Sequence, residues 1–296
     1  MEENSTGQPL VQPQPAKEPV QGNTEIRNYA QGEMLTDGRI CALFLAGWAS
    51  SPVWQFDLVF KDLARAVSDM AIKYADFGQK SFNPEEISDK VAEEIGKKEY
   101  GRYLVVGMGL GGQLAYKVLT KLDAEMTQRT TGILFSTPAS GVDIKDAGKL
   151  LTWILQKQGL AKFLDKFRKI YWKIFGKKKD TNKFTDEMFD TYAHQRAYES
   201  QFSVDTFFTQ ASYFYGFAAD KPVGSRLVVV DAIDDKFLKV SVGWDKVAKE
   251  IDHRKITGGN ADSIVSHMEY ARIIMDEEGR EEQLLHNLME KFGVQG

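Results

Sequence analysis

The chain has 296 residues, a formal net charge of −4 and a single cysteine, Cys41. Its length and its one cysteine exclude a disulfide-stapled miniprotein. Its negative net charge gives no electrostatic reason to bind nucleic acid. With 43% hydrophobic and 27% charged residues, the chain can bury a sizeable core, and no stretch approaches the ~18 consecutive apolar residues of a membrane span. Cys41 lies in an apolar run, so we expect a buried strand thiol, and a cysteine without an intrachain partner fits a cytoplasmic location.

The first 30 residues differ in composition from the rest of the chain. Half of the eight prolines fall before residue 25, where they alternate with glutamines and leave few apolar side chains. Such a segment cannot bury enough surface to offset the loss of chain entropy on folding. We therefore expect residues 1–30 to form a disordered lead rich in proline and glutamine, without the basic start and apolar run of a secretory signal peptide.

From residue 31 the chain alternates short apolar runs with stretches of helical spacing. Runs typical of buried strands occupy residues 39–46, 70–74, 103–106, 133–135, 226–230 and 254–256. Helical spacing is found over residues 56–67, 83–97, 113–122, 242–250 and 267–292. Strands that alternate with helices predict right-handed crossovers and a parallel sheet. We expect this α/β core to be built from two parts, residues 31–140 and 223–296.

Between residues 141 and 222 the alternation stops, and the chain becomes helical and rich in aromatic residues. We expect a helical lid or cap, inserted between the two parts of the core. Within it, residues 157–179 hold nine basic side chains against one acidic side chain, with apolar residues at three- and four-residue steps. Such an amphipathic helix either covers a pocket and leaves its lysines in solvent, or lies on an anionic membrane surface.

The turn Gly107-Met108-Gly109-Leu110-Gly111-Gly112 joins a predicted strand to a predicted helix. Gly107, Gly109 and Gly112 fit the dinucleotide-binding spacing G-x-G-x-x-G, but that motif belongs on the first strand of its unit, and here two strand and helix units come before it. The same turn resembles the nucleophile elbow of the α/β-hydrolase superfamily, Gly-x-Ser-x-Gly-Gly. The resemblance extends over residues 38–290 and implies an α/β fold with a mostly parallel sheet flanked by helices and an inserted helical lid.

A second match lies upstream, where residues 43–48 read Leu-Phe-Leu-Ala-Gly-Trp. They resemble the His-Gly-Trp oxyanion loop of many superfamily esterases, at the expected place after an early strand. The resemblance implies that the backbone N–H groups of Trp48 and Leu110 stabilise negative charge on a bound oxygen. Met108, which precedes the central glycine of the turn, belongs to the same candidate ligand site.

A third match lies downstream, where residues 228–237 resemble the strand and turn that carry the acid of the catalytic triad. Asp235 is the best match to this acid, and Asp234 is the alternative. His267 follows later in the chain, and we expect it in a loop that opens the last helix, at the place of the triad histidine. The order of elbow, acid and histidine is that of the superfamily.

The chain departs from the superfamily pattern at the position of the attacking serine, which is Gly109. Glycine has no side chain that can form an acyl-enzyme, so the standard mechanism cannot operate. Ala46 also replaces the histidine that usually opens the oxyanion motif. Met108, Leu110 and Gly111 supply no substitute nucleophile. Three loop serines near the expected site are interpreted as turn or capping residues: Ser50, Ser51 and Ser136.

These observations leave four functions open. The first is a non-catalytic protein of the superfamily that binds a small apolar or acyl ligand, or a partner through its lid. The second is a hydrolase or acyl-transfer enzyme of the carboxylic-ester class, in which His267 and Asp235 activate water over the retained oxyanion donors. The third is an inactivated variant of a serine hydrolase, and the fourth is a protein tethered to an anionic membrane surface by residues 157–179.

We expect neither a metal ion nor another cofactor. His194, His253 and His286 show no paired spacing, with one another or with carboxylates, that is typical of a metal site. The sequence pattern indicates no particular oligomeric state.

Overall fold

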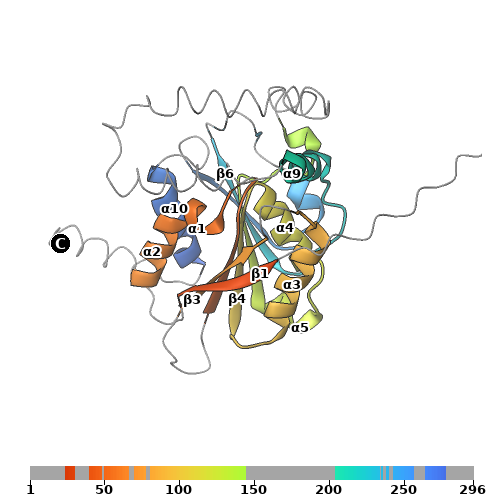
Figure 1. The fold of residues 1–296 in the computed structure, drawn as a ribbon. Coiled ribbons are helices and arrows are strands. Elements are labelled where there is room, and N and C mark those ends of the chain that lie inside the picture. Colours follow the sequence, from red (N-terminus) through yellow and green to blue (C-terminus); the bar gives the residue numbers. More distant parts are fainter. Residues whose placement is uncertain are drawn as a thin grey trace, which may run out of the picture.

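The computed structural model describes residues 24–30, 40–48, 50–66, 70–77, 81–144, 204–233, 235, 238–239, 243–256 and 264–277. Most of the predicted lead and of the predicted lid, including the basic segment 157–179, lies outside these residues. Among the described residues, no helix is long and apolar enough to cross a membrane. Figure 1 shows the arrangement of the elements.

The described residues form one central sheet of seven strands in the order β1-β3-β2-β4-β5-β6-β7. The strands are β1 (Glu25–Ala30), β2 (Ile40–Leu45), β3 (Met70–Asp76), β4 (Arg102–Met108), β5 (Thr130–Phe135), β6 (Arg226–Ala232) and β7 (Ile251–Ile256). All neighbouring pairs are parallel except β1 and β3, which are antiparallel. The prediction of a mostly parallel sheet is confirmed.

Residues 25–30 correct the predicted extent of the disordered lead, because they form the edge strand β1. The ring centroid of Tyr29 lies 4.7 Å from that of Phe60. Arg27 forms an ion pair with Asp76 at 3.2 Å. These contacts join β1 to residues far away in the sequence, so the composition of the segment by itself does not reveal the strand.

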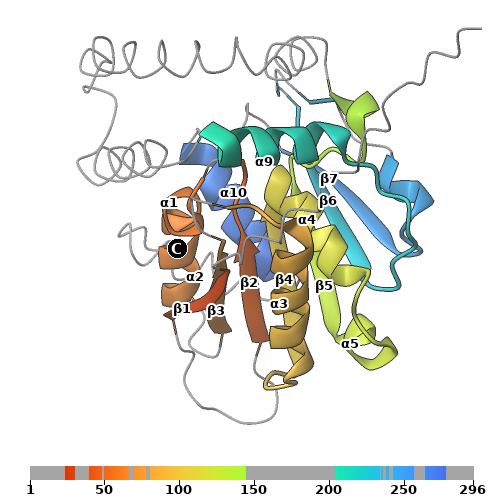
Figure 2. The ribbon, with the colours of Figure 1, turned by 45° about the vertical axis from the view of Figure 1, so that its right-hand side comes forward.

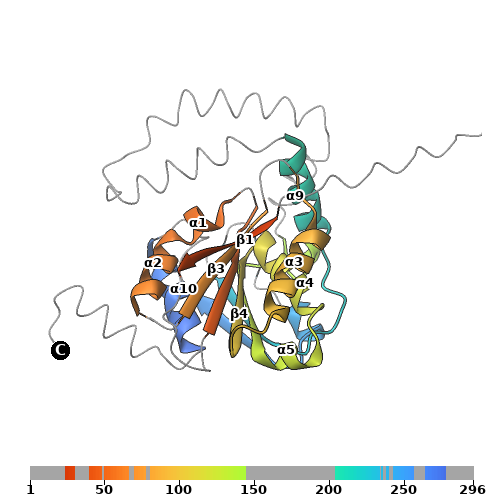
Figure 3. The same ribbon diagram turned by 60° about the horizontal axis from the view of Figure 1, so that its bottom comes forward.

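Helices cover both faces of the sheet. They are α1 (Pro52–Gln55), α2 (Asp57–Ala66), α3 (Pro84–Gly96), α4 (Leu110–Leu119), α5 (Ala124–Arg129), α9 (Val204–Gly216) and α10 (Ile264–Asp276), with the short 3₁₀ helices η1 (Gly141–Asp143) and η3 (Gly243–Lys246). Figures 2 and 3 show α1, α2 and α10 on one face and α3, α4 and α5 on the other. This layered arrangement is the one that parallel sheets require.

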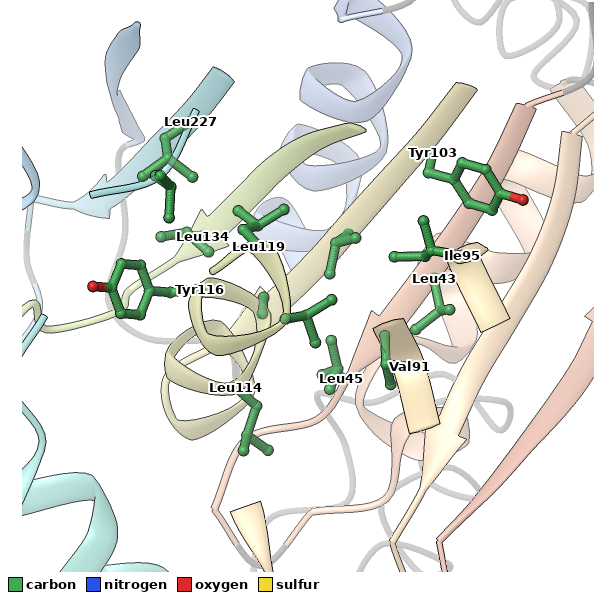
Figure 4. Packing of buried hydrophobic residues seen from close by; sticks show 14 of the residues in the cluster. Leu43, Leu45, Val91, Ile95, Tyr103, Leu114, Tyr116, Leu119, Leu134 and Leu227 are labelled. Atoms are coloured by element: carbon green, nitrogen blue, oxygen red, sulfur yellow. The ribbon is translucent and has the colours of Figure 1, made fainter. Parts of the chain in front are cut away.

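Strand β2 shows how the two layers of the core are built. Phe44 belongs to the cluster that includes α2 and α10, whereas Leu43 and Leu45 belong to the cluster that includes α3 and α4 (Figure 4). Cys41 points to the same side as Leu43 and is 0% exposed, so the predicted buried strand thiol is confirmed. Burial raises the pKa of the Cys41 thiol to about 12.

The helix predicted over residues 242–250 is wrong, because η3 is the only helical turn among the described residues of this segment. Trp244 in η3 is completely buried, and its indole Nε1 donates to the carbonyl oxygen of Thr137 at 3.0 Å. This long-range anchor determines the path of the chain and overrides the local helical spacing.

A buried ion pair joins α3 to β3. Lys73 Nζ lies 2.5 Å from Glu94 Oε1, and the two side chains are 9% and 10% exposed. Burial lowers the pKa of Lys73, but the hydrogen bond and the charge of Glu94 outweigh it, so the pKa is raised. Burial likewise raises the pKa of Glu94, but hydrogen bonds from Lys73 and Lys97 outweigh it, so the pKa of this carboxyl is lowered.

We expect Glu94→Gln to reduce the free energy of unfolding by about 3 kcal/mol at neutral pH, because it leaves the buried Lys73 charge with a weaker partner. The pKa of Glu94 is lowered in the folded state, so its contribution is present above the unfolded-state pKa and is lost as the pH falls through the folded-state pKa. Urea unfolding near pH 7 and near pH 3 measures the difference, which should shrink in acid. Glu25→Gln, at an exposed ion pair with Arg27, is the control with little expected effect. Equal losses for the two variants would contradict the prediction.

Candidate functional site

The carboxyl ends of β4, β5 and β6 lie side by side at one edge of the sheet, because these strands are parallel neighbours. Gly109 follows β4, Ser136 follows β5, and Asp235 comes shortly after β6. Residues from distant parts of the sequence are thereby brought to the same edge. In open α/β sheets, this edge is the usual place for a ligand.

Gly109 forms the turn between β4 and α4, with φ of 54° and ψ of −113°. Its backbone N–H donates to the carbonyl oxygen of Phe135 at 2.9 Å, and its own carbonyl oxygen accepts from the N–H of Gly112 at 3.1 Å. A residue with a side chain carries a strain of ~1–3 kcal/mol in such a conformation, which glycine avoids. Helix α4 begins directly after this turn, at Leu110, earlier than the helical spacing predicted.

Three other glycines allow the first turn of α4 to lie very close to its neighbours. A Cβ atom at Gly107 would lie 2.3 Å from the carbonyl oxygen of Gly111. A Cβ atom at Gly111 would lie 2.0 Å from the carbonyl oxygen of Leu45 in β2. At Gly112 it would lie 1.9 Å from the hydroxyl oxygen of Thr137. A side chain at Gly107 or Gly111 would therefore force backbone segments apart, and one at Gly112 would clash with the buried side chain of Thr137.

Gly109 differs from these three glycines, because a Cβ atom at this position would make only ordinary van der Waals contacts. The atoms nearest to a Cβ at this position are a ring carbon of Phe214 and the carbonyl oxygen of Ser136, both 3.9 Å away. Backbone conformation, and not lack of space, is therefore what favours glycine at position 109.

Gln55 of α1 connects the predicted oxyanion loop to the glycine turn. Its side-chain oxygen accepts from the backbone N–H of Gly47 at 2.6 Å, and its side-chain nitrogen donates to the sulfur of Met108 at 2.9 Å. Met108 is 4% exposed, so its side chain serves this contact within the core. The sequence analysis did not identify Gln55, and its polar side chain between Trp54 and Phe56 is the signal that could have done so.

Trp48 anchors α9 over the same edge of the sheet. Its indole Nε1 donates to the carbonyl oxygen of Phe207 at 3.0 Å, and the two ring centroids are 4.6 Å apart. Farther along α9, the carbonyl oxygen of Phe214 accepts from the side chain of Gln113 in α4 at 3.0 Å. Figure 2 shows α9 above the carboxyl edge of the sheet. This helix is the part of the predicted lid segment that the structure places against the turn.

Asp235 lies in the turn after β6 and is 3% exposed. Its Oδ1 accepts from the backbone N–H of Leu238 at 2.9 Å, and its own N–H donates to the carbonyl oxygen of Ala232 at 3.2 Å. Asp234, the alternative acid, lies outside the described residues. The carboxylate of Asp235 is thus held by the backbone of its own turn, at the edge that also carries Gly109.

His267 lies in the first turn of α10 and not in the loop where it was expected. The ring centroid of Tyr270, one turn later in the helix, lies 4.2 Å from that of Phe135 at the end of β5. This contact places the first half of α10 beside the carboxyl end of β5 and supports a helix where a loop was predicted. The side chain of His267 lies outside the described residues.

Comparison with known proteins rests on structure, because no family model and no curated protein matches the sequence. The type II thioesterase BorB from the borrelidin biosynthetic cluster matches with a TM-score of 0.55 and 11% identity, over 85% of this chain and 94% of that chain. MGS-M2, an α/β hydrolase from a Medee basin deep-sea metagenome library, matches with a TM-score of 0.59 and 11% identity, over 88% and 95%. An epoxide hydrolase from Bacillus megaterium matches with a TM-score of 0.58 and 14% identity, over 86% and 96%. The chain has the α/β-hydrolase fold.

The resemblance drawn from the glycine turn is confirmed for the fold. Identities of 11 to 14% establish this architecture and not a reaction. In the α/β-hydrolase fold observed here, the turn between β4 and α4 lies in the middle of the sheet, because β4 pairs with β2 on one side and β5 on the other.

The described residues contain no group of three histidine, cysteine, aspartate or glutamate side chains that could hold a metal ion. His253 of β7 lies 2.7 Å from Asp245 in an exposed pair. His194 and His286 lie outside the described residues. No candidate metal site therefore emerges from this part of the chain.

A separate cavity of about 480 Å³ lies between α4 and the end of α9. It is lined by aromatic residues such as Tyr116 and by charged groups that already pair with one another. Glu85 forms ion pairs with Lys117 at 2.5 Å and with Lys121 at 3.0 Å. The hydrogen bond from Lys117 lowers the pKa of Glu85. This cavity shares no lining residue with the glycine turn.

Alanine substitutions at two glycines of the turn distinguish close packing from strain. Gly107→Ala would push a Cβ into the backbone of Gly111, so we expect a loss in the free energy of unfolding of more than about 4 kcal/mol, or failure to fold. At Gly109→Ala the new Cβ meets only van der Waals contacts, so this variant should lose only about 1–3 kcal/mol through strain. Urea unfolding measures both.

Gly96→Ala is the control, because a Cβ there meets nothing within 4 Å and the change should be neutral or slightly stabilising. Equal losses at Gly107 and Gly109 would contradict this account of the turn.

Proposed function

We propose that this chain is a non-catalytic protein of the α/β-hydrolase fold that binds a small apolar or acyl ligand at the glycine turn. The observation that carries the proposal is Gly109, which lies at the turn after β4 with no hydroxyl to attack a substrate. A Cβ atom at this position would nevertheless fit without a clash, since the nearest atoms of the described residues outside the turn lie 3.9 Å away.

The effect of losing the nucleophile on turnover is known for other enzymes. In enzymes with a serine triad, its removal lowers turnover by about 10⁶ and leaves roughly 10³ to 10⁴ from binding and oxyanion donors alone. Ala46 is 0% exposed, at the place where the resemblance expects a histidine. Two features of the active superfamily are therefore replaced together, which favours binding over catalysis.

The capacity to bind an oxygen atom depends on backbone groups and so does not require the serine. Leu110 is the first residue of α4, and N–H groups in the first turn of a helix have no acceptor within the helix. The helix dipole also favours a negative oxygen at this end. Aromatic residues of α9, including Phe207 and Phe214, cover the turn and suit an apolar chain. A thioesterase among the similar structures supports an acyl ligand.

A cytoplasmic location is part of the same proposal. Cys41 is buried and unpaired with any other cysteine. A free thiol of this kind is typical of proteins in a reducing compartment.

A fluorophosphonate probe, which labels activated serines, tests the absence of catalysis. We expect no labelling of the parent chain and no hydrolysis of p-nitrophenyl octanoate above background, because position 109 carries no hydroxyl. Gly109→Ser should gain labelling, since the added side chain has space and only its strain of ~1–3 kcal/mol opposes it. Mass spectrometry locates the label.

Gly109→Ala is the matched control, because it introduces the same backbone strain without a hydroxyl. Labelling of the parent chain at any serine would overturn the proposal. Hydrolysis by the parent that disappears in His267→Ala and in Asp235→Asn would support the alternative, in which these residues activate water.

Octanoate and 2-octanone each combine an oxygen acceptor with an apolar chain, so they test the binding of acyl ligands. We expect saturable binding of at least one of them to the parent chain by isothermal titration calorimetry. Gly109→Ala should weaken it by about tenfold, because the new methyl group occupies space beside the oxyanion donors. Gly96→Ala should bind like the parent chain. No binding of either compound by the parent would contradict the proposal for acyl ligands.

A further inference from the structure

Ser136, the residue after β5, has an unusual backbone conformation. Its φ is 42°, and among the described residues it shares a positive φ only with Lys98 and Gly109. Side chains are disfavoured in this left-handed region, which glycine adopts without strain. The chain nevertheless carries a serine here, and the residue is only 4% exposed. Strained residues of this kind concentrate at ligand-binding and catalytic sites.

The hydroxyl of Ser136 is buried and has no hydrogen-bond partner among the described residues. Other polar groups of the same turn are paired: the Ser136 N–H donates to the carbonyl oxygen of Val230 at 2.8 Å, and the Thr137 hydroxyl donates to that of Phe135 at 2.9 Å. Buried hydroxyls in folded proteins nearly always have partners, because an unpaired one has lost its water without replacement. Neither the backbone strain nor the unpaired hydroxyl helps the chain to fold.

The backbone of Ser136 lies beside the glycine turn. The carbonyl oxygen of Ser136 is 3.9 Å from the Cβ position of residue 109, and the backbone N–H of Gly109 donates to the residue just before Ser136. Gln113, one turn into α4, has a second buried polar atom without a partner, its Oε1. Its Nε2 donates to the carbonyl oxygens of Pro138 and Phe214, which determines the orientation of the amide. Unpaired polar atoms therefore lie on two segments that pack against the turn.

We propose that Ser136 is a ligand-binding residue, whose hydroxyl donates a hydrogen bond to the carbonyl or carboxylate oxygen of a ligand held over Gly109. The inference rests on the proposed function and narrows its ligand to molecules with an oxygen acceptor. The ligand oxygen supplies the partner that the described part of the chain does not give to this hydroxyl. The ligand oxygen then accepts hydrogen bonds from the backbone N–H groups of the turn and from the hydroxyl of Ser136, which follows the neighbouring strand β5.

Two substitutions distinguish the hydroxyl from the strain. Ser136→Ala removes the unpaired hydroxyl and keeps a side chain at positive φ, so we expect an unchanged or higher melting temperature. Ser136→Gly removes both features and should raise the melting temperature by a few degrees. Both variants should bind octanoate or 2-octanone about tenfold more weakly than the parent chain, because one hydrogen bond to the ligand oxygen is lost. Differential scanning calorimetry and isothermal titration calorimetry measure the two effects.

Ser225→Ala is the matched control. Ser225 is also buried, at 1% exposure, but its hydroxyl donates to the carbonyl oxygen of Thr127 at 3.1 Å. Its loss should lower the melting temperature and leave ligand binding unchanged.

The outcomes separate this inference from the proposed function. If the parent chain binds a probe and Ser136→Ala binds it equally well, Ser136 is not a ligand-binding residue, and the proposed function stands. If Ser136→Ala lowers the melting temperature as Ser225→Ala does, the hydroxyl is structural and the inference is wrong. If the parent chain binds neither compound, the proposed function fails for acyl ligands, and the inference fails with it.

Discussion

The arrangement of the site depends on how closely the first turn of α4 approaches β2 and the segment after β5. Gly111 lies against the carbonyl oxygen of Leu45, and Gly112 lies against Thr137, at separations that leave no room for a Cβ atom. Gly107 permits the same approach from the strand side of the turn. The contacts at Gly107 and Gly111 involve backbone atoms, which cannot relax by a change of rotamer, whereas Gly112 lies against the buried side chain of Thr137. They hold the start of α4 at the centre of the sheet edge.

This constraint holds the start of α4 in place without any side chain at position 109. The N–H groups at the start of α4 are oriented by the helix itself, and the helix begins where the glycines allow it. Gln55 holds the loop at Gly47 against Met108, and Trp48 holds α9 above them. A chain with this fold can therefore lack a hydroxyl at position 109 and keep the surrounding turn in place. Under the proposed function, ligand binding is retained without covalent chemistry.

The sequence predicted best those elements whose signal is local. Strand β2 is a continuous apolar run because it is buried on both faces, and this composition is readable without the structure. Strand β1 was missed because its few apolar side chains gain their partners from distant segments, as Tyr29 does against Phe60 of α2. The helix expected over residues 242–250 was wrong for a related reason. The buried Trp244 donates a hydrogen bond to the carbonyl oxygen of Thr137, and this contact determines the path of that segment.

The sequence by itself determined the α/β class, the glycine turn and the absence of a hydroxyl at Gly109, because each of these is a matter of residue identity or of short-range spacing. Only the tertiary structure decided that a Cβ atom fits at Gly109 but clashes at the three neighbouring glycines. It also brought Gln55, Ser136 and α9 to the same edge of the sheet. Such contacts join residues that are far apart in the chain, and their distances depend on how strands and helices pack, which no local pattern of residues specifies.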